Sequence, residues 1–490
     1  MFSILHISDL HRSQEDPVTN ASLLSALLTD CGRYRTETPP IPSPGAIIVS
    51  GDLVRGAAIG THNYTDVIQR QYDDAYAFLS QLADRCVAGD RRRVVIVPGN
   101  HDVCWNTAHS AMCRVEGQQQ LSQLPGLLED PANGYRWSWH DRHLYKVTCE
   151  DRYRERLDAY WTFVERFYRD VNLRLPLDRD RGFNLFELDE GRIIVAALES
   201  VHGNDCYADH GGFTLDAIAN AGLLIRDMRR HQLSIGVWHH SVHGPPHRSD
   251  YMNIDTVYEM IGNGFRLGFH GHQHYSQAVP HHIHLPDRHA MALVGAGSLC
   301  AGVRELPRGM NRQYNVVVVA DDYSSAAIHV REMTMGNQFT RTHRAPFSVD
   351  GSVTLQWDPP VDAVGQPLDR ESSRERDVIL KAEDAMRDGD PMRAVDLLEG
   401  VHRALGSHAD RLFVEAARTA ERWDLLVTRL RQPDNAEQLV LLVEALAESS
   451  RPEDALEALR TFGEQVNLPE HIRGDLAERL QIHIQLRSMP

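Results

Sequence analysis

The chain has 490 residues, of which 42% are hydrophobic and 24% are charged, and its formal net charge is −17. This composition excludes a largely disordered chain and leaves room for one large and one smaller domain. The net charge disfavours broad, non-specific adhesion to nucleic acid, although it allows a local basic groove. The sequence has no apolar N-terminal stretch and no run of about 18 apolar residues, and its seven cysteines form no CxxC pair. We therefore expect a cytoplasmic protein with free thiols and without a signal peptide or membrane span.

Five short apolar runs, rich in β-branched residues, predict buried strands. They span residues 2–8, 45–50, 93–98, 233–238 and 266–269. Open α/β sheets bind ligands outside the carboxyl ends of their strands. We therefore expect the polar side chains that follow these five runs to converge on one point.

Seven potential metal ligands follow these runs. They are Asp9 and His11 in ISDLH, Asp52 in VSGDL, Asn100 in VPGNHD, His239 in IGVWHHS, and His272 and His274 in FHGHQH. Carboxylate oxygen, amide oxygen and imidazole nitrogen suit Mn²⁺, Fe or Zn²⁺, and the absence of cysteine argues against a structural zinc site. Seven ligands are enough for two adjacent metal sites.

These fragments, in this order, resemble the calcineurin-like metallophosphoesterase superfamily. The resemblance implies an α/β fold, a four-layer α/β/β/α sandwich, with two divalent metal ions, Mn²⁺ being favoured and Fe, Zn²⁺ or Mg²⁺ possible. It also implies that Asp52 bridges ions ~3.5–4 Å apart that polarise a phosphoryl group and activate a bridging water as hydroxide. By this resemblance one ion is held by Asp9, His11 and His274, and the other by Asn100, His239 and His272.

His101 directly follows Asn100 and, by the same resemblance, is not a ligand. It would contact the phosphate or protonate the leaving group, and general acid catalysis typically contributes ~10²–10⁴-fold to the rate. For Asp102 two roles stay open, one catalytic and one structural. It either orients His101 through a hydrogen bond or caps the segment that follows.

Two adjacent histidines follow the run at residues 233–238. Successive residues of an extended segment point in opposite directions, so only one of them should face the metals. In the family that the sequence resembles, the ligand is usually the histidine directly after the strand, which favours His239 over His240. In the following loop, His240, His243 and His247 either line the mouth of the substrate site or are merely solvated.

An insertion at about residues 103–190 precedes a strand expected at 191–198. It contains a candidate amphipathic helix, whose apolar stripe we interpret as facing the core. The alternative is that its aromatic side chains stack bases while neighbouring arginines contact phosphates. The insertion could also form a cap over the metal site. The stripe consists of Tyr153, Leu157, Tyr160, Trp161, Val164, Phe167 and Tyr168.

The strand pattern continues at residues 291–299, 314–320 and 326–333, and we predict that residues 1–350 form the metallophosphoesterase domain. Residues 351–373 are rich in Pro, Gly and Asp, and indicate a linker.

Residues 374–490 have a helical pattern throughout and predict an all-α, helical-repeat-like domain. Small and apolar residues recur at the same offsets after Pro391 and Pro452, which resembles tetratricopeptide-like hairpins, although the separation is not a multiple of the usual period. Such modules bind partners. A plain helical bundle, or an element for self-association, is the alternative.

The fragment GDLVRG, residues 51–56, lacks the second Asp of the GDxxDRG signature found in protein serine/threonine phosphatases of this superfamily. The pattern is closer to the phosphodiesterase and nuclease-like branches, and predicts a phosphodiester substrate in a nucleotide or nucleic acid. One alternative is a phosphomonoesterase acting on a small molecule or nucleotide. Another is a partner-binding helical-repeat protein in a bacterial defence or signalling assembly, with the phosphoesterase as its effector or as an inactive scaffold.

Overall fold

The computed structural model describes the whole chain apart from a set of short segments. These are residues 14–17, 117–132, 229, 244–249, 283–289, 303–304, 335, 345–346, 348–350, 358–377, 380, 383–384, 387–388, 400–407, 434, 467 and 488–490. The chain divides into two compact units, one ending at Val364 and the other beginning at Gly365. Within the described part of the chain, no helix has the length and apolar character needed to cross a membrane.

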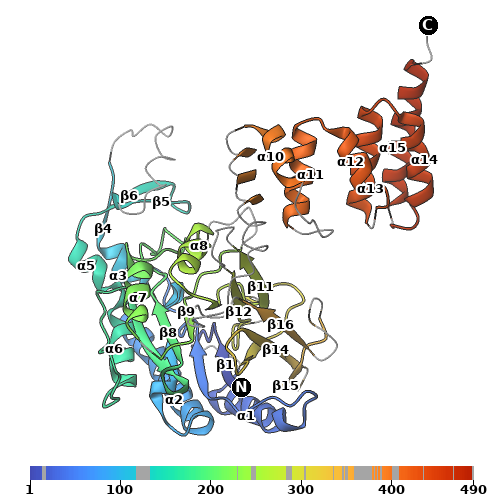
Figure 1. Ribbon diagram of the computed structural model, residues 1–490. Coiled ribbons are helices and arrows are strands. Elements are labelled where there is room, and N and C mark those ends of the chain that lie inside the picture. The colour runs from blue at the N-terminus through green and yellow to red at the C-terminus, as the bar shows by residue number, and fades with distance from the viewer. Residues whose placement is uncertain are drawn as a thin grey trace. The chain divides into compact units, whose positions relative to one another are not determined.

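A seven-stranded sheet forms one half of the first unit (Figure 1). Its order is β15-β14-β13-β1-β2-β3, and β16 also pairs with β14. The strands β1, β2 and β3 run parallel, whereas β13 is antiparallel to β1. Helices α1 (Asn20–Arg33) and α2 (Tyr64–Cys86) pack their apolar side chains into the core that contains this sheet. The strands are β1 (Phe2–Ile7), β2 (Ala46–Val49), β3 (Val94–Ile96), β13 (Gln313–Val319), β14 (Ser325–Thr334), β15 (Gln338–Arg341) and β16 (Ser352–Gln356).

A six-stranded sheet forms the other half, in the order β11-β12-β10-β9-β8-β7. Strand β8 shows how its two faces are covered: Val195 lies in the core shared with the first sheet, whereas Ala196 lies in a second core with α7 (Ala217–Arg226) and α8 (Asp255–Gly262). Burial on both faces explains the uninterrupted apolar sequence of this strand. The strands are β7 (Phe183–Leu188), β8 (Ile193–Leu198), β9 (Leu233–Val237), β10 (Leu267–His270), β11 (Gln277–His282) and β12 (Ala290–Gly295).

All nine strand-like runs identified in the sequence form strands, and the mixed α/β fold is confirmed. The start of the expected linker is wrong, however. Strand β16 pairs with β14, and Trp357 after it is buried and donates its indole N–H to the Tyr323 carbonyl at 2.7 Å. The alternating sequence SVTLQ suits an edge strand, and this explains why it joins the sheet. The rest of the expected linker, residues 358–373, lies outside the described residues.

The described residues of the insertion form a three-stranded sheet, in the order β4-β6-β5, and the α-helices α3, α5 and α6. All seven residues of the predicted apolar stripe are buried, as is Phe163, whose ring stacks on Tyr72 of α2 at 5.4 Å. The stripe therefore faces the core, and the alternative of base-stacking aromatics is wrong for this helix. The elements are α3 (Trp105–Ser110), β4 (Met112–Arg114), β5 (Tyr135–Ser138), β6 (His143–Val147), α5 (Glu150–Arg154) and α6 (Asp158–Phe167).

In the second unit, the described residues from Pro391 onward form helices that each pack on the next along the chain. Pro391 and Pro452 stand at the first turns of α10 and α14, where a missing backbone N–H costs nothing. Two apolar cores result, one around Leu398 and Phe413 and the other around Leu442 and Leu459. The helices are α10 (Pro391–Glu399), α11 (His408–Thr419), α12 (Trp423–Arg429), α13 (Ala436–Glu448), α14 (Pro452–Phe462) and α15 (Glu470–Arg487).

Candidate metal centre

Five of the seven predicted ligands lie in tight turns beyond the ends of β1, β2 and β10. Their φ angles are positive: 52° for Asp9, 44° for His11, 54° for Asp52, 73° for His272 and 58° for His274. Residues other than glycine rarely adopt this left-handed conformation, which costs on the order of 1–3 kcal/mol each. Such strain concentrates at functional sites. Here it turns polar side chains from separate strands toward one another.

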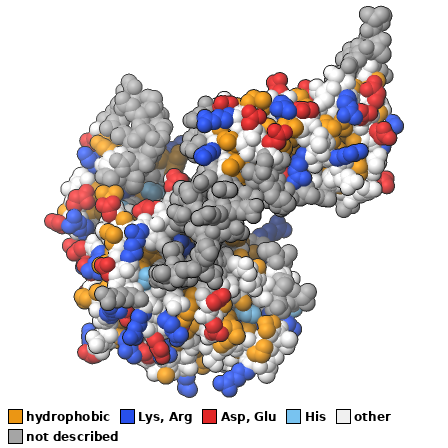
Figure 2. Space-filling model, viewed as in Figure 1, with side chains coloured by type: hydrophobic (Ala, Val, Ile, Leu, Met, Phe, Trp, Pro, Cys, Tyr) orange, Lys and Arg blue, Asp and Glu red, His pale blue; other side chains and the backbone are white. Residues whose placement is uncertain are grey.

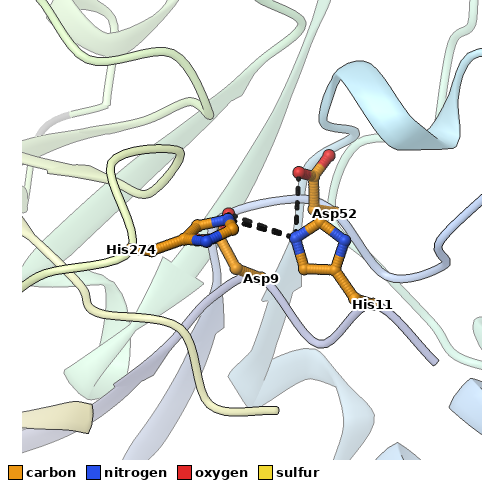
Figure 3. A group of neighbouring side chains, drawn as sticks. All are labelled: Asp9, His11, Asp52 and His274. Carbon is orange, nitrogen blue, oxygen red and sulfur yellow. Dashed lines mark hydrogen bonds and ion pairs between the residues drawn. The ribbon is translucent and has the colours of Figure 1, made fainter. Parts of the chain in front are cut away.

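The first group of side chains is Asp9, His11, Asp52 and His274, whose ligand atoms all lie within 4.8 Å of one another (Figure 3). The Nε2 atoms of His11 and His274 are 3.2 Å apart, and His274 Nε2 lies 3.2 Å from Asp9 Oδ1. Among the described residues, the buried Asp9 Oδ1 has no hydrogen-bond donor of regular geometry. A buried carboxylate oxygen that faces imidazole nitrogens in this way is suited to bind a cation.

The second group is Asn100, His239 and His272. Asn100 Oδ1 lies 3.0 Å from His239 Nε2 and 3.1 Å from His272 Nδ1. Asp52 joins the two groups, because its Oδ2 is 3.5 Å from His11 Nε2 in the first and 3.3 Å from His239 Nε2 in the second. The structure thus brings all seven predicted side chains together, with one carboxylate between two sets of three.

Backbone carbonyls fix the orientation of two of the imidazoles. His239 donates its Nδ1 hydrogen to the Ser50 carbonyl at 2.8 Å, and His274 donates its Nδ1 hydrogen to the Glu305 carbonyl at 2.8 Å. Both rings therefore present an unprotonated or titrating Nε2 to the centre, the arrangement usual for metal-binding histidines. His272 presents Nδ1 instead, and its Nε2 lies 3.4 Å from Asp250 Oδ2.

The centre is electrostatically polarised. Burial raises the pKa of Asp52, but the neighbouring His239 and His101 outweigh it and hold that pKa below its usual range. Conversely, burial lowers the pKa of His239, but attraction to Asp52 prevails and raises it to about 9. A protonated imidazole thus balances the carboxylate. Metal ligation requires neutral imidazole, so metal binding would release that proton.

Glycines allow the close approach of these segments. A Cβ at Gly99, in the GNHD fragment, would lie 2.2 Å from Asp52 Oδ1, and one at Gly271, in GHQH, would lie 1.9 Å from Ser8 Oγ. No side chain fits at either position without displacing a candidate ligand or its support. The glycines of the two fragments are therefore structural requirements of the centre.

His101 lies beside the cluster. Its backbone N–H donates to Asp52 Oδ1 at 2.9 Å, its ring packs edge-on against His11 at 4.7 Å, and its Nδ1 donates to the Arg55 carbonyl at 2.9 Å. The last bond leaves Nε2 for contact with a ligand. The ring also borders a cavity of about 640 Å³.

Asp102 does not orient His101, and this predicted role is wrong. Its carboxylate is buried and accepts hydrogen bonds from the Gly99 N–H at 2.8 Å, the Leu53 N–H at 3.2 Å and the Tyr72 hydroxyl at 3.0 Å. Three donors of this kind fix the side chain away from the imidazole. It holds the turn that carries Asn100 from within. It does not cap the following helix α3, whose N-cap is Cys104, so the capping alternative is wrong as well. Burial raises its pKa to about 7.

Of the histidine pair, His239 lies in the cluster and His240 lies outside it. The buried His240 ring places Nδ1 3.0 Å from Ser200 Oγ. His243 stacks on His281 at 4.9 Å and does not border the cavity next to His101, whereas His247 lies outside the described residues. Sequence reasoning missed Ser200, whose hydroxyl accepts hydrogen bonds from the backbone N–H groups of His239 and His240, at 3.1 Å and 3.3 Å.

A family model for the calcineurin-like phosphoesterases matches residues 2–276, more than half of the chain and the region that contains all seven predicted ligands. The chain belongs to the calcineurin-like phosphoesterase family. A comparison with curated proteins gives no significant match.

Solved structures similar to this chain are distant in sequence. A single mutant of Vps29 from Entamoeba histolytica is 9% identical, with a TM-score of 0.26, covering 73% of this chain and 100% of its own. Vps29 from Chaetomium thermophilum is 12% identical, with a TM-score of 0.26 and coverages of 75% and 100%. The calcineurin-like phosphoesterase YfkN from Bacillus subtilis is 14% identical, with a TM-score of 0.28 and coverages of 69% and 87%. The family assignment therefore rests on the sequence match.

Family membership and the Asp9, His11, Asp52 and His274 cluster indicate a metal-dependent phosphoesterase with a divalent metal centre. The donor set fits such a centre, since it combines carboxylate oxygens, an amide oxygen and imidazole nitrogens without any thiolate.

Proposed function

We propose that the protein is a phosphodiesterase with two divalent cations, Mn²⁺ being favoured. The observation that carries this proposal is the position of Asp52 Oδ2 between two sets of three ligand atoms. One cation would be held by Asp9, His11 and His274, the other by Asn100, His239 and His272, and Asp52 would be shared. Bound there, two cations would polarise the phosphoryl group and lower the pKa of a water nucleophile.

His101 is the group of this chain best placed to hold a proton for the leaving oxygen. Its Nδ1 donates a hydrogen bond to the Arg55 carbonyl. Nε2 is therefore the ring nitrogen that can give a proton to the leaving oxygen. The His101 backbone N–H donates to Asp52 and its Nδ1 donates to the Arg55 carbonyl, so the imidazole is held beside the carboxylate that would be shared by the cations. Both constraints suit a general acid, whose contribution depends on correct positioning as well as on pKa.

The space beside His101 extends well past the volume of one phosphate and can take an organic group of the substrate. The cavity there measures about 640 Å³, in the range of pockets for small ligands. The absence of the second Asp of the protein phosphatase signature, in residues 51–56, agrees with a diester substrate.

The helical unit supports a second proposal, that it is a tetratricopeptide-like module for a protein partner or for self-association. Its helices pack consecutively, each on the next, as the helices of stacked hairpins do. It would fold separately from the metallophosphoesterase domain and contribute no catalytic group. Its presence in a defence or signalling assembly, and the cytoplasmic location of the chain, stay predictions.

The test of the phosphodiesterase is hydrolysis by the metal-free protein after addition of Mn²⁺, Mg²⁺, Zn²⁺ or Fe²⁺. The substrates are bis(p-nitrophenyl) phosphate, p-nitrophenyl phosphate, cyclic nucleotides, and single- and double-stranded DNA and RNA. We expect the diesters to be cleaved faster than the monoester, best with Mn²⁺, and chelator to abolish the reaction. A metal-loaded protein that cleaves the monoester alone would instead establish the phosphomonoesterase.

A further inference from the structure

The cavity beside His101 lies next to the candidate metal centre, because His101 lines the cavity and its ring packs against that of the candidate ligand His11. Its lining includes His101 itself, the aromatic side chain of Trp105, and the cationic side chains of Arg55 and Arg70. The His101 ring lies 6.1 Å from the Trp105 ring and 4.7 Å from the ring of the candidate ligand His11. The cavity therefore begins on the side of the metal centre where the proposed general acid stands.

One wall of the cavity is held in place by side-chain hydrogen bonds to the loop after Asp52. The amide of Asn106 donates to the carbonyls of Ala57 and Ala58, at 3.2 Å and 2.9 Å, and accepts from the Gly60 N–H at 2.8 Å. The amide of Gln71 pairs with both the N–H and the carbonyl of Gly56, at 3.0 Å and 3.1 Å. A loop fixed at these points forms a preorganised wall, as ligand sites usually have.

The lining has a chemical character that differs from that of the chain as a whole. The chain carries a net charge of −17, and on the face drawn in Figure 2 basic and acidic side chains are intermixed. The cavity instead has two guanidinium groups and one carboxylate, Glu305, which lies 3.3 Å from Arg55. It is thus a local cationic site, of the kind that the overall charge allows.

Arg70 and Trp105 supply the two contacts that a nucleotide needs. Arg70 is exposed, and the hydrogen bond from its Nε to the Asp66 carbonyl, at 3.1 Å, directs the guanidinium. No described residue accepts a hydrogen bond from its terminal nitrogens, which suit an anion. Trp105 is half-buried, so part of its ring is available, and base stacking on an aromatic ring is a sequence-tolerant source of affinity.

We propose that this cavity binds the leaving-group nucleotide of the substrate, with its base on Trp105 and a second phosphate on Arg70 and Arg55. The inference rests on the proposed phosphodiesterase function and narrows the substrate to nucleotidyl phosphodiesters, such as an oligonucleotide end or a linear dinucleotide. Water would add its oxygen to phosphorus and lose a proton to solvent. The bond from phosphorus to the leaving oxygen would break, and that oxygen would keep the electron pair and take a proton from His101.

The test uses the full-length, Mn²⁺-loaded protein and adenosine 3′,5′-bisphosphate, which combines a base with two phosphates and has no diester to be cleaved. Its dissociation constant is measured by calorimetry for the unsubstituted protein and for Arg70→Ala, Trp105→Ala and Trp105→Phe. The matched control is Arg85→Ala, because Arg85 is exposed on the same helix, α2, but does not border the cavity. Circular dichroism and the melting temperature show whether each variant is folded.

We expect the bisphosphate to bind the unsubstituted protein, and Arg70→Ala and Trp105→Ala each to weaken it by about tenfold. Trp105→Phe should retain most of the affinity, and Arg85→Ala all of it. Absence of binding, or affinities in folded Arg70→Ala and Trp105→Ala equal to that of the unsubstituted protein, overturns the proposal. If Trp105→Ala does not fold, Arg70→Ala decides alone. Metal-dependent hydrolysis of the panel of diesters is measured separately, and its absence for every diester overturns the proposed function instead.

Discussion

The two units of this chain differ in what they bury. The first buries the ionisable side chains of Asp9, Asp52 and His239 almost completely, with their polar atoms directed at one another. Among the described residues of the second, Asp410 is the one buried charged side chain, and it pairs with Arg429 at 2.6 Å. Burying a charge costs several kcal/mol unless it is paired or binds a metal. The first unit therefore has buried ionisable groups arranged as a reactive or metal-binding site would have them, whereas the second unit is held together mainly by apolar packing.

The largest effect should come from removing the carboxylate shared by both groups of ligands. Asp52→Ala should lose both metal ions, because without a shared anion the two cations repel each other, and activity should fall to that of the metal-free protein. Metal analysis and diester hydrolysis measure this. The control is Asp90→Ala, which removes a carboxylate paired with Arg92 outside the centre. This variant should keep both metal ions and the hydrolytic activity. A fully metallated, active Asp52→Ala protein would contradict the shared position.

The adjacent histidines test one half of the centre alone. His239→Ala should lose one metal equivalent, because His239 Nε2 lies 3.0 Å from Asn100 Oδ1 and 3.3 Å from Asp52 Oδ2. His240→Ala should keep two equivalents, since its ring bonds to Ser200 outside the cluster. Both side chains are buried, so each variant carries a comparable packing defect. The reverse metal counts would assign the ligand to His240.

His101 separates catalysis from metal binding within the same unit. His101→Ala should keep both metals and lower the rate by ~10²-fold or more, because it removes a proton donor and no ligand. Metal analysis and diester hydrolysis by the purified variant measure the two effects separately. Loss of a metal ion from the purified variant would make His101 a ligand.

The sequence predicted the strands and the convergence of the seven side chains because both follow local rules. Apolar β-branched runs form buried strands, and polar residues just after parallel strands meet at one edge. Contacts between distant segments had no such signal. The carbonyls of Ser50 and Glu305 fix two imidazoles, yet any residue supplies a carbonyl. Asp102 follows His101 in sequence, but Gly99, Leu53 and Tyr72 determine where its carboxylate points.

The smallest effect should come from removing the second unit, the helical one, whose described residues contain no cluster of buried ionisable side chains. A chain ending at Val364 should bind two metals and cleave a small diester within about tenfold of the full chain, ~1.4 kcal/mol in barrier. A chain ending at Asp350 is the sharper comparison, because it also removes β16 with the buried Leu355 and Trp357. Losing a buried Leu or Trp side chain typically costs ~2–5 kcal/mol of stability. The chain ending at Asp350 should therefore have a much lower melting temperature than the chain ending at Val364. The melting temperature of the chain ending at Val364 should equal that of the first unit in the full-length protein. If the chain ending at Val364 aggregates or fails to bind metal, the helical unit is part of the catalytic fold, and the contrast between the units does not describe their roles.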